Sequence, residues 1–354
     1  MNDASRTQQL LSLGQHRSLI LGLSSFVLPV IGALVFTTLI LLSTGVAPLE
    51  AYRLIMLGAF STPARLGDAA MLAAPLALCA AGLAISFAAG LYNLGIEGQM
   101  TLGAVFAMLV LRLLPDLPPP LLWSLALLAG ALGGALWALL AGALRLYARV
   151  SEIFAGLGLN FLATGVTLYL VFGPWKRPGT ASMSGTEPLP EALWLPTLGR
   201  LRLAPLAPVI AVAAVLLVWF VLSRTRWGLA VRATGLNAAA AARIGVPAGR
   251  RLLEAIGACG ALAGVAGGIQ VLAVFHALIP NISSGIGLLG LLVALLVRAN
   301  PAWVLPVAAA FACFTVGSIQ LPLALSIDSS IAGVLQGALV LFALAAGGLR
   351  RSER

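Results

Sequence analysis

Charged residues are scarce in this sequence. They make up 9% of the 354 residues, whereas about a quarter is usual in a soluble domain. Hydrophobic residues make up 60% of the chain, and the mean hydropathy is +1.05. The apolar residues form runs close to the ~20 residues that a helix needs to cross a bilayer. The composition therefore excludes a soluble globular protein and predicts a polytopic membrane protein.

Lysine, histidine and cysteine are also rare, with one, two and three residues respectively. Lys176 does not stand in the Gly-x4-Gly-Lys-Ser/Thr pattern of a phosphate-binding loop, so the chain cannot hydrolyse ATP by that route. His16 and His276 do not form a zinc motif, and we expect no metal site. The cysteines stand far apart in apolar runs, which is typical of buried small hydrophobic residues. Because no nucleophile–base pair is visible either, an intramembrane enzyme is disfavoured.

Ten apolar runs are candidates for transmembrane helices. They are rich in Leu and Ala and lack the alternation of barrel strands, so the predicted fold class is all-α. The runs are 19–44, 70–89, 97–114, 121–144, 153–173, 205–222, 255–275, 286–297, 302–321 and 329–348. The eighth run would reach only ~18 Å as a helix, so we expect it to be short, re-entrant or broken. The predicted domains are a tail at 1–18, a single transmembrane domain at 19–348 and a tail at 349–354.

The net charge of +10 can be explained by membrane topology. If the N-terminus is cytoplasmic and all ten runs cross, cytoplasmic segments carry 14 of the 21 basic residues. Cytoplasmic loops are expected to carry this excess of basic residues, so we place both termini in the cytoplasm and the protein in the plasma membrane. No arginine cluster is interleaved with aromatic residues, so the lipid bilayer is an expected partner and nucleic acid is not.

Five polar residues interrupt the apolar runs and are our candidates for a translocation pathway or gate. Asn93, Glu97 and Gln99 lie with two glycines at the start of the third run, where broken backbone is tolerated only if protein or a water-filled cavity satisfies it. Glu97 fits either a gate element or a capped helix start at the interface. Asn160 and Gln270 fit either interhelical hydrogen bonds or contacts with a solute.

Three glycines recur every four residues in the seventh run. Gly260, Gly264 and Gly268 would permit close approach of another helix backbone. We therefore predict that this face serves helix packing.

The longest cytoplasmic segment, 223–253, contains six arginines. Within it, Asn237 can cap an alanine-rich helix, Gly245 can end that helix in a left-handed conformation, and Pro247 prevents continuation. The pattern predicts a two-turn helix at 237–244. So short a helix is unstable alone in water, which indicates that it docks onto something.

Several stretches together resemble the permease subunits of ATP-binding-cassette importers of the ribose, branched-chain amino acid and nucleoside class. Residues 93–99 are similar to the Asn-Ile-Gly-x-Glu-Gly-Gln signature of the nucleoside-type branch. Residues 232–246 resemble the coupling segment, Arg-Ala-x-Gly-x-Asn-x3-Ala-x4-Gly-Ile, and 287–301 resemble a glycine-rich run ending in Asn-Pro. The resemblance covers about residues 50–348. Ala238 stands where a proline is frequent and Val297 where a glycine is common.

The resemblance implies an inverted-repeat permease fold that has no cofactor of its own. It also implies three partners: a cytoplasmic ATPase that binds ATP and magnesium, a second and shorter permease in a heterodimer, and an extracytoplasmic substrate-binding protein. The residues that match the coupling segment, and that we expect to contact the ATPase, are Arg232, Gly235, Asn237, Ala241, Arg243 and Gly245. The expected cargo is a nucleoside or nucleobase. A sugar or branched-chain amino acid permease, or an ATP-independent channel or carrier, stays open as an alternative.

Overall fold

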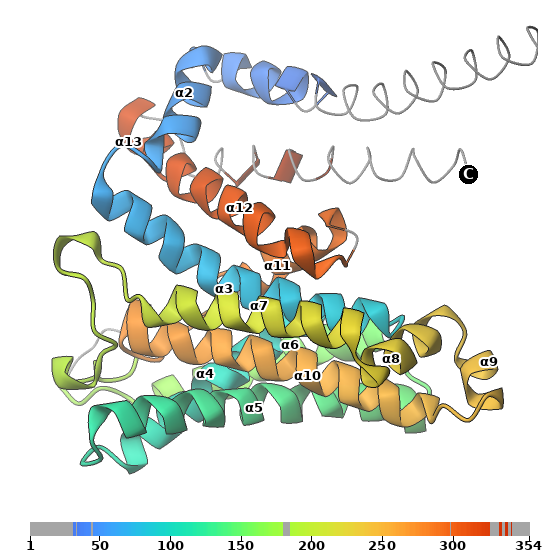
Figure 1. Cartoon of the computed structure of the whole chain (residues 1–354). Helices are drawn as coiled ribbons and strands as arrows, with labels where there is room; N and C mark the ends of the chain where they lie inside the picture. Colours follow the sequence, from blue (N-terminus) through green and yellow to red (C-terminus); the bar gives the residue numbers. More distant parts are fainter. Residues whose placement is uncertain are drawn as a thin grey trace, which may run out of the picture. The chain divides into compact units, whose positions relative to one another are not determined.

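The computed structural model of the chain describes residues 31–32, 34–43, 45–179, 185–297, 299–325, 333–334, 337–338 and 341. Contacts divide the chain into two compact units, one made of residues 1–59 with 314–354 and the other of residues 60–313. The main helices are α2 Pro48–Gly58, α3 Pro63–Ala88, α4 Ile96–Leu113, α5 Pro119–Ala148, α6 Glu152–Phe172, α7 Leu206–Arg224, α8 Arg226–Leu236, α9 Ala238–Arg243, α10 Ala248–Ile269, the π-helix η3 Gln270–Phe275, α11 Ile286–Leu296, α12 Val304–Ser318 and α13 Gln320–Leu325 (Figure 1). Short 3-10 helices occupy Glu191–Leu193, Gly199–Leu201 and Pro301–Trp303.

The all-α class is confirmed for the described part of the chain, where the one strand-like pairing is an isolated bridge between Lys176 and Thr186. Seven described helices are long and apolar enough to cross a membrane, or up to eight if Leu34–Ser43 and Pro48–Gly58 form one bent span. The run at 286–297 forms a helix of 11 residues, which is short as expected. Ten crossings and the sides of the termini stay a prediction, because most of the first and last runs lie outside the described residues.

Several helices extend past the charges at which the predicted runs end. α10 begins at Ala248 rather than at 255 because the charges in its first turns pair with one another: Glu254 accepts bonds from Arg250 and Arg251 on the same helix. α3 begins at Pro63, with the side chain of Thr62 accepting a bond from a backbone N–H as an N-cap. Two helices, α2 and α8, were not predicted, since each has 11 residues and neither contains a long apolar run.

α10 packs against α3, α4 and α5 in the unit of residues 60–313. Glycines make this packing close. A Cβ added to Gly264 would overlap the carbonyl oxygen of Gly130 on α5, and one added to Gly103 on α4 would overlap Gly264 itself. A Cβ on Gly260 would similarly overlap the carbonyl oxygen of Gly134. The backbones therefore touch where side chains would otherwise separate them.

The two ends of this bundle differ. α8 and α9 lie at one end, which we call the α8–α9 end (Figure 1). The loop before α7 lies against the far end of α10, where the Leu195 N–H donates a 3.1 Å bond to the carbonyl of Leu272 and Trp194 stacks on His276 at 3.7 Å. We call this the opposite end.

The other unit has its own core, formed by α2, α13 and the helix at 34–43. Buried residues Leu41, Val46, Ala51, Ile55 and Leu321 form one apolar cluster there.

Candidate functional site

The chain turns back into the bundle between α3 and α4. Asn93 lies in this turn and is 1% exposed. Its Nδ2 donates a 3.2 Å bond to the sulfur of Cys259, a residue about 16 Å along α10 from Ala248 at 1.5 Å per residue. α4 therefore begins inside the bundle rather than at its end.

Two amides hold this turn together. Asn93 and Gln99 bond reciprocally, with Nδ2 donating to Oε1 at 2.9 Å and Nε2 donating to Oδ1 at 3.0 Å. The Asn93 Oδ1 also accepts a bond from the Gly95 N–H. Because each amide satisfies the other, this buried pair stabilises the helix break.

Asn160 on α6 caps α4 from outside. Its Oδ1 accepts a 2.8 Å bond from the Gly98 N–H in the first turn of α4, and its Nδ2 donates a 2.9 Å bond to the carbonyl of Leu94. The N-cap residue of α4, Gly95, has no side chain that could do this. Asn160 thus satisfies one donor and one acceptor of the broken backbone.

Glu97 connects this break to α11. Its Oε1 accepts a 2.8 Å bond from the Leu288 N–H, which belongs to the first turn of α11. Gly287 packs directly against Ile96 and Glu97, and the preceding Gly285 adopts φ +78°. The N-termini of α4 and α11 therefore meet at one carboxylate, whose charge is favourable at the positive ends of both helix dipoles.

Gln270 lies apart from the cluster formed by Asn93, Glu97, Gln99 and Asn160. It is 3% exposed, and its Oε1 has no hydrogen-bond partner among the described residues. It begins the π-helix that continues α10, and such π segments occur frequently at functional sites. Of the five polar candidates, the structure brings four together and leaves Gln270 nearer the opposite end.

Two helices, α8 and α9, contain most of the stretch 232–246 that resembles a coupling segment. As the sequence predicts, the Asn237 side chain caps α9 by accepting a 2.9 Å bond from the Ala240 N–H, and Gly245 follows at φ +85°. The preceding helix α8 has a cap of the same kind, since Thr225 Oγ1 accepts a 3.1 Å bond from the Gly228 N–H. Sequence reasoning missed α8, although the N-cap threonine was a usable signal.

Two glycines seat α8 on the bundle. Gly228 touches the backbone of Val221 and Leu222 on α7, and Gly235 touches the backbone that ends α3. Ala241 on α9 is 2% exposed. Three large apolar residues on or next to these helices are left exposed: Leu229 and Leu236 on α8, and Ile244 directly after α9.

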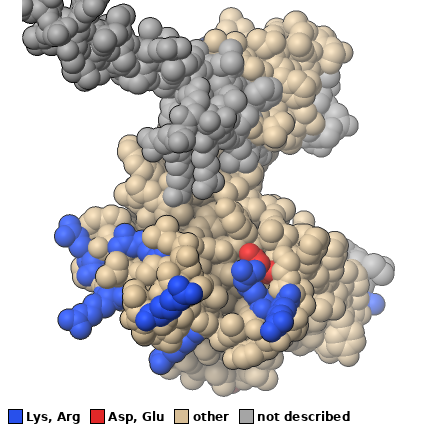
Figure 2. Space-filling view, turned by 90° about the vertical axis from the view of Figure 1, so that its right-hand side faces the viewer, with Lys and Arg blue, Asp and Glu red and all other residues tan. Residues whose placement is uncertain are grey.

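Basic side chains surround these apolar residues. Figure 2 shows basic side chains gathered over the α8–α9 end, with little acidic surface between them. The exposed arginines at this end are Arg149, Arg224, Arg226, Arg232, Arg243 and Arg250. The surface therefore combines exposed apolar residues with positive charge.

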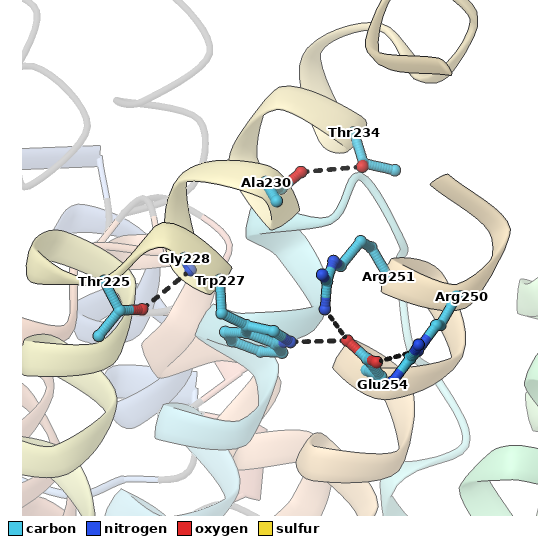
Figure 3. A network of polar contacts seen from close by, with 8 residues as sticks. All are labelled: Thr225, Trp227, Gly228, Ala230, Thr234, Arg250, Arg251 and Glu254. Carbon is cyan, nitrogen blue, oxygen red and sulfur yellow. Dashed lines mark hydrogen bonds and ion pairs between the residues drawn. The ribbon is translucent and has the colours of Figure 1, made fainter. Parts of the chain in front are cut away.

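A carboxylate joins α8 to α10 behind this surface. Glu254 accepts bonds from Trp227 Nε1 at 2.7 Å, Arg250 Nε at 2.8 Å and Arg251 Nη1 at 2.5 Å (Figure 3). Trp227 belongs to α8, whereas both arginines belong to the first turn of α10. Sequence reasoning did not single out this network, because the partners Trp227 and Glu254 stand 27 residues apart.

Comparison with known proteins gives consistent matches over most of the chain. A family model described as "Branched-chain amino acid transport system / permease component" matches residues 65–344. The guanosine ABC transporter permease protein NupP of Bacillus subtilis is 25% identical over 88% of this chain and 90% of its own length. The glucose ABC transporter permease protein TsgB13 of Haloferax volcanii is 29% identical over 89% of this chain and 85% of its own length.

Nucleoside relatives occur in named pairs. The nucleoside ABC transporter permease protein NupB of Lactococcus lactis is 25% identical over 79% of each chain. A second matching permease protein is found in each of the two bacteria, NupQ beside NupP and NupC beside NupB.

Proposed function

The chain belongs to the permease-component family of branched-chain amino acid transport systems, and from this premise we propose how it works as one subunit of a larger importer. It is a multi-pass membrane protein and the permease subunit of an ATP-binding-cassette importer, a transport component rather than an enzyme. We propose that ATP and magnesium bind to a separate ATPase subunit. The chain itself then supplies the pathway through the membrane.

The surface at the α8–α9 end carries this proposal. Leu236 at the end of α8 is 89% exposed and Ile244, directly after α9, is 77% exposed, although α8 packs closely on the bundle through Gly228 and Gly235. Large apolar side chains at such exposure favour a protein partner, especially when a polar and charged rim surrounds them. We propose that a cytoplasmic ATPase covers them, which places the α8–α9 end in the cytoplasm and the chain in the plasma membrane.

The direct contacts with the ATPase would come from the segment around α9. We assign this role to Arg232, Gly235, Asn237, Ala241, Arg243 and Gly245. Movement of the docked ATPase on ATP binding would shift α8 and α9 and switch access of the pathway from one side to the other.

We propose that the cargo is a nucleoside or nucleobase. Relatives named for guanosine and nucleoside transport match most of this chain, while the glucose relative makes a sugar the alternative. The pathway residues in this proposal are Asn93, Glu97, Gln99, Asn160 and Gln270. Glu97 and Asn160 are partly accessible, so they are the first candidates for a direct contact, whereas Asn93 and Gln99 act by holding the break in place.

The partner subunits follow from the same comparisons. Two relatives per bacterium support pairing with a second permease, which we propose to be a shorter paralogue in a heterodimer. An extracytoplasmic binding protein would deliver the solute to the opposite end.

Competition for uptake tests the cargo. The transporter is produced by co-expression of this chain with its ATPase, second permease and binding protein. Uptake of labelled guanosine, uridine and glucose is measured against excess unlabelled nucleosides, glucose or leucine. We expect the unlabelled nucleosides to compete and glucose and leucine not to. Uptake of labelled glucose that nucleosides fail to inhibit would contradict the nucleoside assignment and favour the sugar alternative.

A further inference from the structure

α8 lies on the bundle through two kinds of contact. Gly228 and Gly235 give it flat backbone contacts with α7 and the end of α3. Among the described residues, one side-chain hydrogen bond joins α8 to α10, the 2.7 Å bond from Trp227 Nε1 to Glu254 Oε2. Figure 3 shows the indole pointing from α8 toward this carboxylate.

The acceptor is held firmly in position. Arg250 Nε bonds one oxygen of Glu254, and Arg251 Nη1 bonds the other at the same time as Trp227. The side chain of Glu254 is 28% exposed and that of Arg251 is 24% exposed, so water screens this group only in part. Bonds to a charged acceptor are stronger than those to a neutral one, and this carboxylate has three.

α10 leads from this carboxylate into the bundle. Cys259, five residues beyond Glu254, accepts the bond from Asn93 in the helix break. Gly260 and Gly264 follow and pack against α5 and α4 without intervening side chains. Because interhelix contacts of this closeness resist independent sliding, a displacement of the first turns of α10 reaches the start of α4.

We propose that Trp227 and Glu254 form the link that transmits movement of the α8–α9 segment to α10, with Glu254 as a positioning residue that acts through Trp227. The glycine contacts hold α8 against α7 and the end of α3, whereas the directional bond from a rigid indole to a fixed carboxylate connects α8 to α10 and moves α10 with it. This inference rests on the proposed docking of an ATPase at α8 and α9. It adds the connection between that surface and the helix break.

The test compares transport with ATP hydrolysis in the co-expressed complex. W227F keeps the ring but removes the N–H donor, and E254Q keeps the shape but removes the charge. Matched controls are W219F, on an exposed tryptophan of α7, and E191Q, on an exposed glutamate of the loop at the opposite end. We expect W227F and E254Q to assemble with the ATPase and hydrolyse ATP within about twofold of the wild type, while solute transported per ATP falls about fivefold or more.

The double variant shows whether the two residues act together. If Glu254 acts through Trp227, W227F/E254Q transports no less per ATP than W227F alone, because W227F already removes the donor of the bond between the two residues. Three outcomes would overturn the proposal. The losses in the double variant could be additive, or both single variants could keep the transport ratio of the wild type. Assembly and transport could also fall equally, which is what a purely structural role would give.

A measurement on the purified chain separates this inference from the proposed function. Hydrogen exchange of the α8 amides should accelerate at least about threefold in W227F and stay unchanged in W219F. Equal exchange in the two variants would overturn the link whatever the transporter carries. The proposed function is tested instead by whether wild-type uptake requires ATP.

Discussion

The carboxylate of Glu97 accepts a 2.8 Å hydrogen bond from the backbone N–H of Leu288, 191 residues later in the chain. Sequence reasoning left Glu97 open between a gate and the cap of its own helix. The structure shows capping geometry, but the backbone N–H that donates to Glu97 belongs to α11 rather than to α4. Any movement that separates α4 from α11 must therefore break a bond to a charged group.

Substitution of Glu97 should separate the roles of its shape and its charge. E97Q keeps an acceptor for the Leu288 N–H and loses the charge at the helix N-terminus, so we expect a loss of about 0.3–2 kcal/mol in unfolding free energy. E97A leaves the N–H without its partner, which costs about 1–3 kcal/mol. Thermal unfolding in detergent measures both, with E191Q as the control; equal stabilities of E97Q and E97A would argue against a capping role.

Close packing of α10 predicts a strong effect of one added methyl group. In G264A the new Cβ would overlap the carbonyl oxygen of Gly130, so we expect destabilisation of about 1–3 kcal/mol. G158A on α6 is the matched control, since nothing lies within 4 Å of its Cβ and alanine favours a helix by about 0.5–1 kcal/mol. If both variants unfolded at the same temperature, the described contact between α10 and α5 would be wrong.

The residues that end α9, Asn237 and Gly245, predict which variants weaken docking of the ATPase. N237A removes the cap, at a cost of about 0.5–2 kcal/mol, while N237S retains an acceptor. G245A places a Cβ at φ +85°, where the strain is conformational because no atom lies within 4 Å. We expect N237A and G245A to lower the amount of ATPase that co-purifies and N237S to restore most of it. Full recovery of ATPase with N237A and G245A would remove α9 from the docking surface.

The burial of His276 predicts that the folded protein loses stability in acid. Burial lowers the pKa of His276 below its usual value, and the neighbouring backbone of Leu272 offsets this only in part. The unfolded chain therefore binds the proton more readily than the folded chain, so stability is complete above about pH 6.5 and falls as the pH decreases through that value.

A substitution isolates this titration. H276N removes the titrating group and tolerates the left-handed backbone at φ 53°. We expect its unfolding temperature to vary less between pH 7.5 and pH 5.5 than that of the wild type or of H16N, the matched change at the other histidine. The same slope in all three proteins would contradict the prediction.

The sequence predicted the features that depend on neighbouring residues. Apolar runs located the seven long helices, and the positions of Asn237 and Gly245 gave both ends of α9. Helix ends were less accurate where charges pair along one helix, as Glu254 does with Arg250 and Arg251, because a scan for apolar runs stops at the first charge.

Partners distant in sequence could not be predicted. Asn160 stands 62 residues from the Gly98 N–H that it accepts, and Glu97 stands 191 residues from Leu288. Each was recognisable as a polar residue that needs a partner inside an apolar run. Which backbone group it satisfies depends on how the three helices α4, α6 and α11 pack, and the sequence pattern carries no such information.

The requirement for ATP tests the central claim most directly. Uptake of labelled nucleoside is measured in proteoliposomes that contain either this chain alone or the chain with its ATPase, second permease and binding protein, with ATP or a non-hydrolysable analogue on the side of the ATPase. The account predicts uptake only by the complete complex and only with hydrolysable ATP. Equal uptake by the chain alone without ATP would contradict it and establish a channel or carrier instead.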